Sequence, residues 1–425
     1  MLADFAPDEI YHLAAYHRSS ATDVRLTEAD EEQLYFRNNV EATRGLLRSA
    51  HELLPRSRVF LAGSCHLFGH TEESPQSERT PIRPNNLYGI TKAIHNALHG
   101  APATVSSSDW DHFFDVNRAA ARDLELDGDL IMIHDPQPAA LAAMRRRPGQ
   151  TWVWRCHIDL SAASPEVWEV IGDQVAYYDS AIFSHHAFVP ALGIPAYLVP
   201  PSIDPLSDKN RAMDEAEERA LLAPFELPAR KPLAVQVSRF DRLKDPVGVI
   251  DAFVLSRRWE DSHLVLAGGS ADDDPEGAEV LAEVRARAAG RTDVTLLSLP
   301  PDAHLVINAL QRRAAVVVQK SLREGFALTV SEALWKQRAV IAGAVGGIPL
   351  QVIHDRTGVL VRSVEGCAYQ IARLLRSPDL RRRLGRNGHE HVRQSFLLPR
   401  EARDYLGVFA RALVTQAASR EAAVR

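Results

Sequence analysis

The chain has 425 residues, enough for two or three domains at roughly 150 residues each. Apolar residues make up 46% and charged residues 24%, which excludes a disordered or fibrous chain. The formal net charge of -6 provides no global attraction to nucleic acid or to an anionic membrane. The three cysteines are far apart in the sequence, which excludes a disulfide framework and a CxxC metal or redox motif.

Signals for export or membrane insertion are missing from the sequence pattern. No apolar stretch reaches the ~18 residues that a membrane-spanning helix needs, and the first nine residues carry acids but no basic residue.

The histidine pairs His66/His70 and His95/His99 have no carboxylate to complete a zinc ligand set. We therefore expect a cytoplasmic protein that has no metal site and no nucleic acid or membrane partner, and we leave homo-oligomer formation open.

Short apolar runs alternate with longer amphipathic segments along the chain, as in parallel-sheet α/β domains. A helix is predicted over residues 29–54, and a proline-rich connector over residues 199–205 excludes a helix there. Ser377, Pro378 and Asp379 form a helix start signal near the end of the chain. The predicted strands are residues 9–14, 58–62, 130–133, 152–154, 181–183, 233–237, 263–267, 294–297, 315–318 and 339–341.

This pattern predicts two Rossmann-like doubly wound lobes of α/β class with a cleft between them. Ligands of such sheets sit beyond the carboxyl ends of the strands. We expect a first segment at residues 1–90, the rest of the first lobe at 91–206, and the second lobe at 207–425.

Charged residues follow two predicted strands of the second lobe. Arg239 and Lys244 come just after the strand at 233–237, and Glu324 and Glu332 form an E-x7-E pair after the strand at 315–318. The two cations suit a diphosphate, and the two carboxylates are pure acceptors for sugar hydroxyls. Each element alone is common in unrelated proteins, but together they predict a site for a nucleotide-diphosphate sugar.

Backbone groups complete the predicted donor site. The amides of Leu328 and Thr329 open a predicted helix, where they can bind a phosphate. Gly346 and Gly347 follow the strand at 339–341. We assign these four residues to donor binding.

Residues 91–425 resemble the retaining family 4 glycosyltransferases of GT-B fold. They are more similar to the trehalose glycosyltransferring synthases, which join nucleotide-activated glucose to free glucose. The cation pair and E-x7-E belong to the broad family. The segments His-Asp-Pro-Gln-Pro at 134–138 and Trp-Arg-Cys-His-Ile-Asp at 154–159 belong to the narrower group.

The resemblance implies a role for each matched residue. Arg239 and Lys244 would hold the leaving diphosphate, Glu332 the ribose, and Glu324 the transferred glucose. His157 would face the donor sugar, and Asp135 would bind hydroxyls of the acceptor. The alternative for His134 and His157 is a hydrogen-bonded histidine at a strand end. We prefer that alternative for His134, whereas the family match favours a site role for His157.

The implied chemistry is retaining transfer without a protein nucleophile and without a required cofactor. The acceptor hydroxyl attacks from the face that the diphosphate leaves, and the departing phosphate oxygen takes its proton. The substrates would be glucose and a nucleotide-diphosphate glucose, with the base of UDP-, ADP- or GDP-glucose left open. The enzyme contributes positioning and stabilisation of the developing charge.

The first ~90 residues resemble a different family, the extended short-chain dehydrogenases, nearest to GDP-mannose 4,6-dehydratase and nucleotide-sugar epimerases. Ser64, Tyr88 and Lys92 match the positions that hold the sugar for hydride transfer, and His66 stands where the dehydratases have glutamate. The two resemblances meet within residues 88–94, where both families read alike. No glycine-rich dinucleotide turn precedes Pro7, so NAD(P) binding is not expected.

Three functions stay open at this point. The first is a trehalose-synthase-like glycosyltransferase, which covers most of the chain. The second is an NAD(P)-dependent nucleotide-sugar dehydratase or epimerase fragment. The third is a catalytically impaired protein that still binds nucleotide sugars through Arg239, Lys244 and Glu332.

Overall fold

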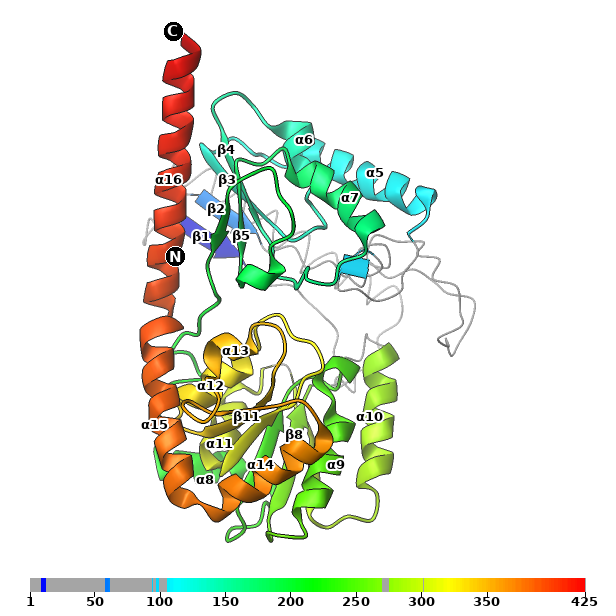
Figure 1. The fold of residues 1–425 in the computed structure, drawn as a ribbon, viewed down its shortest axis with the longest axis vertical. Helices are drawn as coiled ribbons and strands as arrows, with labels where there is room; N and C mark the ends of the chain where they lie inside the picture. Colours follow the sequence, from blue (N-terminus) through cyan, green and yellow to red (C-terminus); the bar gives the residue numbers. More distant parts are fainter. Residues whose placement is uncertain are drawn as a thin grey trace, which may run out of the picture. The chain divides into compact units, whose positions relative to one another are not determined.

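The computed structural model describes residues 105–269, 275–300 and 302–424, with Ile94, Ala97 and Leu98 and the backbone of two earlier strands. The chain divides into two units, residues 1–72 with 84–88 and residues 73–83 with 89–425. In the first unit, β1 (Glu9–His12) pairs in parallel with β2 (Arg58–Leu61) (Figure 1). The helix predicted at 29–54 lies outside the described residues.

The second unit begins with a lobe built on a four-stranded sheet, which we call the first lobe. Its strands are all parallel and follow the order β3-β4-β5-β6. They are β3 (Leu130–His134), β4 (Thr151–Arg155), β5 (Ser180–Phe183) and β6 (Ala196–Leu198). The helices are α5 (Ser107–Asp123), α6 (Leu141–Arg145) and α7 (Pro165–Val175), with the short 3-10 turn η2 (His186–Phe188).

The inner strand β4 is buried on both faces. Its side chains alternate between the two faces of the sheet, and each face is covered. Trp152 and Trp154 belong to the core formed with α5, α6 and α7. Val153, between them, packs on the opposite face with Ile182 and with Val408 of the last helix. Helices therefore cover both faces of this parallel sheet, as the apolar run predicts.

The second lobe contains a six-stranded parallel sheet of order β12-β11-β10-β7-β8-β9. Its strands are β7 (Leu233–Val237), β8 (His263–Gly268), β9 (Val294–Ser298), β10 (Val316–Gln319), β11 (Ala339–Gly343) and β12 (Val359–Val361). The helices are α8 (Glu215–Leu222), α9 (Pro246–Ser256), α10 (Pro275–Ala288), α11 (His304–Arg313), α12 (Leu328–Trp335), α13 (Ile348–Gln351) and α14 (Val364–Arg376). Two 3-10 turns also occur, η3 (Ala223–Phe225) and η4 (Arg242–Lys244).

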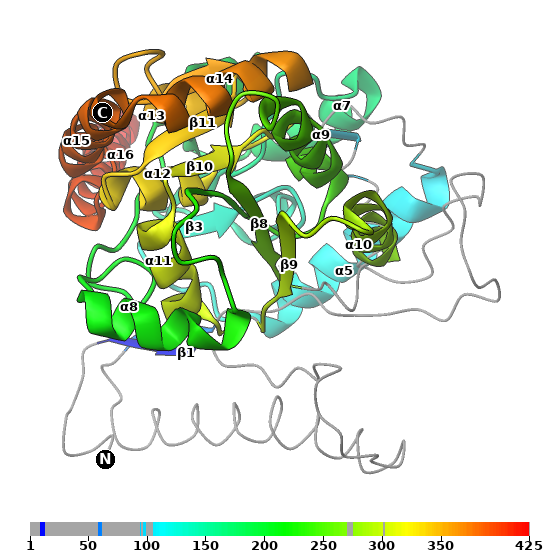
Figure 2. The ribbon, with the colours of Figure 1, turned by 90° about the horizontal axis from the view of Figure 1, so that it is seen from below.

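Two cores sandwich this second sheet. α9, α10 and α14 pack on one face, with Ala234, Leu264 and Val316 from the strands. α8, α11 and α12 pack on the other, with Val235 and Val265. Figure 2 shows α9 and α14 on one side of the strands and α8 and α11 on the other. The sheet is therefore doubly wound, as predicted.

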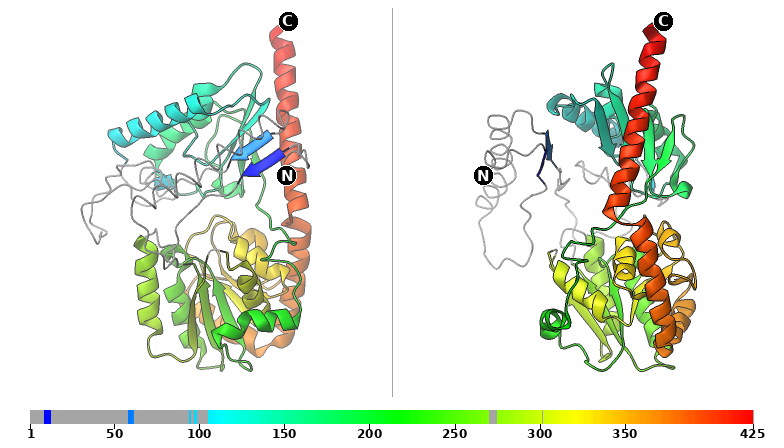
Figure 3. Two further views of the ribbon diagram at one scale, coloured as in Figure 1. Left: turned by 180° about the vertical axis from the view of Figure 1, so that it is seen from behind. Right: turned by 90° about the vertical axis from the view of Figure 1, so that its left-hand side faces the viewer.

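The end of the chain is helical, with α15 (Pro378–Ser395) followed by the long α16 (Leu398–Val424) (Figure 3). The Ser377 hydroxyl accepts a hydrogen bond from the backbone N–H of Leu380 at 3.4 Å, so the predicted helix start is confirmed. The connector at 199–205 is not helical, and Ile203 bridges to Leu397 between α15 and α16.

Every predicted strand matches an observed strand within one or two residues at each end. The prediction missed β6 and β12, which are three residues long and lie at the edges of their sheets. Their sequences, Ala-Tyr-Leu and Val-Leu-Val, are apolar, but a run of three residues is too short to stand out as a strand in the pattern. Among the described residues, no helix combines the length and the apolar character needed to cross a membrane.

Candidate functional site

The second sheet changes its winding direction between β7 and β10, which are adjacent although far apart in sequence. Open α/β sheets bind ligands at such a switch point, beyond the carboxyl ends of the strands. The segment after β7 leads to Lys244, and the segment after β10 leads to Glu324. The two predicted motifs therefore meet at the place where this fold binds ligands.

Lys244 and Glu324 form an ion pair at the switch point. The Lys244 Nζ lies 2.7 Å from both carboxylate oxygens of Glu324, and the side chains are only 19% and 9% exposed. The Ser321 hydroxyl donates to Glu324 Oε2 at 2.9 Å, and Gln236 Nε2 donates to the Lys244 carbonyl at 2.9 Å. A neighbouring polar side chain thus holds the Glu324 carboxylate, and another holds the Lys244 backbone.

A second ion pair supports the first and was missed in the sequence. Lys320, at the end of β10, pairs with Asp245 directly after Lys244. Asp245 has φ 49° and also accepts from the Gly248 N–H at the start of α9. The signal available was an aspartate before Pro246, which is typical of a helix start.

Glu332 is buried on α12 and has an unused acceptor. Its side chain is 5% exposed, and its Oε2 has no hydrogen-bond partner among the described residues. Buried carboxylate oxygens are normally hydrogen-bonded. An unpaired carboxylate oxygen is suited to accept a hydrogen bond from a hydroxyl group of a ligand.

The start of α12 also has free donors. The helix begins at Leu328 after Ala327, which has φ 68°, and no side chain of the described residues caps it. The N–H groups in the first turn of a helix have no intrahelical partner. Leu328 and Thr329 therefore lie where backbone amides and the helix dipole favour an anion.

Gly346 and Gly347 pack against the loop that carries Glu324. A Cβ at Gly346, where φ is 52°, would lie 1.6 Å from the Glu324 carbonyl oxygen. A Cβ at Gly347 would lie 2.6 Å from the carbonyl oxygen of Gly325, which already accepts the Gly347 N–H at 2.8 Å. Only glycine permits this close approach. The contacts support the position of Glu324, and donor binding by these glycines stays a prediction.

Arg239 stands apart from the buried ion pair. Its side chain is 64% exposed and lies 3.2 Å from Asp241. Phosphate binding by Arg239 stays a prediction.

The first lobe brings His134, Asp135 and His157 together at the carboxyl ends of β3 and β4. His134 Nδ1 and His157 Nε2 lie 2.9 Å apart, and the rings are stacked at 11°. Asp135 has φ 65°, and its Oδ1 accepts the backbone N–H of His157 at 2.9 Å. His134, which we interpreted as a hydrogen-bonded histidine at a strand end, has the predicted site histidine itself as its partner.

The histidine pair is held neutral. Desolvation, followed by the charge of Arg155, lowers the pKa of His157 to about 4. Desolvation and His157 also lower the pKa of His134, against the opposing effect of Asp135. Because one ring nitrogen must donate to the other, only one proton is shared between the two facing nitrogens. A neutral imidazole here is suited to hydrogen-bonding a sugar hydroxyl.

Two further predictions concern the dehydrogenase-like residues and a metal site. Ser64, Tyr88 and Lys92 lie outside the described residues. Within the described residues, no cluster of histidine, cysteine and acidic side chains is arranged to hold a metal ion.

Three family models match the chain. "Trehalose synthase, N-terminal domain" matches residues 80–190, and "Glycosyl transferases group 1" matches residues 218–391. "GDP-mannose 4,6 dehydratase" matches residues 1–101, which confirms the separate resemblance of the N-terminal segment. With two parallel-sheet α/β lobes, these matches define the chain as a glycosyltransferase of GT-B fold, and therefore as an enzyme.

Similar proteins narrow this class. A trehalose synthase of Rubrobacter xylanophilus is 40% identical over 336 residues, which cover 77% of this chain and 80% of that one. A trehalose synthase of Pyrococcus horikoshii is 36% identical, covering 76% and 80%. The chain belongs to the trehalose synthase family.

Solved structures share the fold at low identity. A UDP-forming α,α-trehalose-phosphate synthase of Burkholderia xenovorans, in complex with glucose-6-phosphate, superposes with a TM-score of 0.62 at 18% identity. The match covers 77% of this chain and 83% of that one. It confirms the predicted GT-B architecture.

Proposed function

We propose that this enzyme transfers glucose from a nucleotide-diphosphate glucose to free glucose, with retention at the anomeric carbon, and so forms trehalose. The observation that carries the proposal is the Lys244–Glu324 ion pair at the switch point, together with the unpaired oxygen of Glu332 on α12, the helix that follows the Glu324 loop. A cation, a hydroxyl acceptor and a second acceptor match the diphosphate, the glucose and the ribose of one donor molecule.

In the proposed step, a hydroxyl of the acceptor glucose attacks C1 of the donor on the face from which the diphosphate departs. The C1–O bond to the acceptor forms as the C1–O bond to phosphate breaks. The acceptor proton passes to the departing phosphate oxygen, so the reaction balances without a protein base. Retention follows because attack and departure share one face.

Lys244 and Arg239 stabilise the negative charge that grows on the diphosphate. A cation ~4 Å from that charge contributes roughly 4 kcal/mol at an effective dielectric near 20. Glu324 accepts from a donor glucose hydroxyl and Glu332 from the ribose. The amides at the start of α12 bind a phosphate oxygen.

The first lobe supplies the sugar-facing groups. Neutral His157 hydrogen-bonds the donor glucose, and His134 fixes which nitrogen of His157 carries the proton. The Asp135 carboxylate lies beside His157, whose backbone N–H it accepts. We assign acceptor hydroxyls to this carboxylate.

The test is a product assay on the purified full chain. The enzyme is incubated with glucose and UDP-, ADP- or GDP-glucose, and the products are examined by NMR. We expect α,α-trehalose and one equivalent of nucleoside diphosphate with at least one donor. Absence of trehalose with all three donors overturns the proposal. Glucose 1-phosphate formed from trehalose and inorganic phosphate would instead indicate phosphorolysis at the same site.

A further inference from the structure

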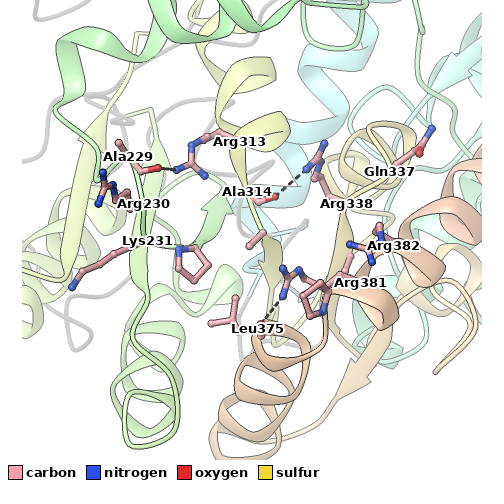
Figure 4. A pocket seen from close by; sticks show the side chains of 14 residues that line it. Ala229, Arg230, Lys231, Arg313, Ala314, Gln337, Arg338, Leu375, Arg381 and Arg382 are labelled. Carbon is pink, nitrogen blue, oxygen red and sulfur yellow. Dashed lines mark hydrogen bonds between the residues drawn. The ribbon is translucent and has the colours of Figure 1, made fainter.

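A strongly basic cavity lies in the second lobe at the amino ends of β7, β10 and β11. Its volume is about 670 Å³, and Pro232, Ala315 and Ala339, at or next to the first residues of the three strands, line its floor. Figure 4 shows arginines from different elements directed around one space. No carboxylate is among its described lining residues. Six of these residues are positively charged, namely Arg230, Lys231, Arg313, Arg338, Arg381 and Arg382.

Three of these guanidiniums are anchored by backbone carbonyls. Arg313 donates to the Ala229 carbonyl at 2.8 Å, Arg338 to the Lys336 carbonyl at 3.1 Å, and Arg381 to the Leu374 carbonyl at 2.6 Å. None of the three forms an ion pair with a described residue. An arginine has five N–H donors, so these bonds fix the side chain and leave further donors for a ligand.

Burial and neighbouring charges both act on the arginines of this cavity. Burial, followed by the charges of Glu218, Arg312 and Arg313, sets the pKa of Arg338, and the net effect is a lowered pKa. Burial and the neighbouring Arg382 likewise lower the pKa of Arg381, although Glu260 opposes them. Neighbouring guanidiniums repel Arg338 and Arg381 while one carboxylate attracts each of them, and an anion in the cavity would add to that attraction.

Glu218 and Glu260 act on Arg338 and Arg381 without forming an ion pair with them, and two further acids pair with cavity cations. Lys231 pairs with Asp261 at 3.0 Å, and Arg382 pairs with Asp379. Both carboxylates are largely exposed, at 62% and 91%, and exposed pairs of this kind are weak. Arg230 has no hydrogen bond or ion pair with any residue that the structure describes.

A purely structural role explains part of the arrangement. Arg338 donates to the Ala314 carbonyl after α11, and Arg381 donates to carbonyls in the last turn of α14. Cations at helix C-termini are favourable. That role does not explain why Arg230, Lys231 and Arg382 border the same cavity.

This cavity is separate from the proposed donor site. The donor site lies at the carboxyl ends of β7 and β10, and the basic cavity lies at their amino ends. The five residues of β7 span roughly 16 Å at ~3.3 Å per residue. One small molecule bound at the donor site would not occupy both.

We propose that the basic cavity binds a small phosphorylated metabolite that carries at least two negative charges. Its volume lies in the range of small-molecule pockets, about 300–1,000 Å³. Guanidinium groups bind phosphate oxygens in pairs and keep their charge when half-buried. A sugar bisphosphate and a nucleotide share this chemistry.

The test is calorimetric titration of the full-length protein with glucose 1,6-bisphosphate, with ATP and with inorganic pyrophosphate. The cavity variant is Arg230→Gln/Arg382→Gln, because both residues are exposed and their loss removes no buried contact. The matched control is Arg285→Gln/Arg386→Gln, which removes two exposed charges from the same lobe outside the cavity. Lys244→Ala serves as the donor-site variant.

We expect one of the three probes to bind the wild-type protein and to bind the cavity variant about 100-fold more weakly, at about tenfold per arginine. The control pair and Lys244→Ala should keep that affinity within about threefold. Preference for the bisphosphate or for ATP identifies the class of metabolite, and preference for pyrophosphate indicates recognition of phosphate alone. The proposal is overturned if no probe binds at millimolar concentration. It is also overturned if the control pair weakens binding as much as the cavity pair, or if Lys244→Ala alone abolishes binding.

Discussion

The ammonium of Lys244 lies 2.7 Å from both carboxylate oxygens of Glu324, across 80 positions of sequence. Each residue is assigned to a different part of the same donor molecule. Without a donor, the two charges satisfy each other in a largely buried position. A bound diphosphate would compete with Glu324 for the Lys244 donors and free the carboxylate to accept from glucose.

Removing the Lys244 charge tests the role of this pair in transfer. Lys244→Ala is expected to slow glucose transfer by about 10²–10³-fold, because the leaving diphosphate loses a nearby cation. The measurement is kcat for release of the nucleoside diphosphate. Lys244→Arg keeps the charge and should recover part of the rate.

The control for this experiment is Arg219→Ala, which removes a cation from an exposed pair on α8. It should leave kcat unchanged. Circular dichroism of each variant at the assay temperature establishes that it is folded. A kcat of Lys244→Ala within a few-fold of the wild-type value would contradict the phosphate assignment.

The unpaired oxygen of Glu332 gives a second prediction. Glu332→Gln preserves the shape of the side chain but replaces one acceptor oxygen by an NH2 donor. We expect nucleotide-diphosphate glucose to bind about tenfold more weakly, since a hydrogen bond to a charged group is lost. Calorimetry measures the Kd, with Glu390→Gln, an exposed acid on α15, as the control. Equal affinities for Glu332→Gln and the wild type would remove Glu332 from the donor site.

The glycine beneath the Glu324 loop gives a third prediction. Gly346→Ala should destabilise the protein by more than about 3 kcal/mol, through the positive φ and the clash with the Glu324 carbonyl. Gly290→Ala is a matched control, because Gly290 has φ 72° but open space around its Cβ position. It should lose only about 1–2 kcal/mol. Urea denaturation measures both, and equal losses would show that the close approach to Glu324 has no energetic effect.

The sequence was sufficient to predict the strands of four or more residues, but not the contacts between strands. β7 was predicted to the residue because its five residues, four of them apolar, lie between Pro232 and Ser238. The pairing of Lys244 with Glu324 depends on β7 and β10 being neighbours, which is a property of the whole sheet order. The Lys320–Asp245 pair was missed for the same reason, since nothing local in Val316–Gln319 indicates a buried partner for the next lysine.

The sequence also predicted the two histidine motifs without predicting the contact between His134 and His157. The motif at 134–138 and the motif at 154–159 were recognised separately. Their contact follows from the register of two parallel strands, in which His134 lies beside Arg155. That register places His157 two residues further along, where its Nε2 meets His134 Nδ1. Side-chain partners set by register cannot be read from either segment alone.

The low pKa of His157 gives a fourth prediction. Its folded pKa of about 4 lies below the ordinary 6.5, so the unfolded state binds more protons between these values. The stabilisation from neutral His157 is therefore complete above about pH 6.5 and is lost as the pH falls towards 4. The charged or titratable neighbours are His134, Asp135 and Arg155.

An NMR titration of ring-labelled histidines measures this directly, with the His157→Asn variant assigning the resonance. The His157 signal should stay in its neutral position from pH 8 to pH 5.5. Urea midpoints should also fall less between pH 7 and pH 5 in His157→Asn than in the wild type. A His157 signal that titrates near pH 6.5 would contradict the shared-proton geometry.

The buried Lys336 gives the last prediction. Its Nζ donates to Asn210 Oδ1 at 3.0 Å, Gln311 Oε1 at 2.8 Å and the Glu332 carbonyl at 3.1 Å, so it ties α12 to α11 and to residue 210. Burial lowers the pKa of Lys336 to about 7, with Glu332 opposing and Arg312 and Lys209 adding to the effect. Between pH 7 and about 10.5 the unfolded chain binds the proton that the folded protein releases, so stability rises with pH in this window.

Lys336→Met isolates this contribution, because it removes the titrating group and keeps the length of the side chain. From pH 7 to pH 9.5, the wild type should gain roughly 2–3 kcal/mol more unfolding free energy than the variant. Urea denaturation at the two pH values measures the difference, and all other titrating groups cancel in the comparison. If the unfolding free energies of both proteins change equally with pH, Lys336 is charged throughout this window. The three hydrogen bonds of its ammonium would then offset the cost of burying the charge.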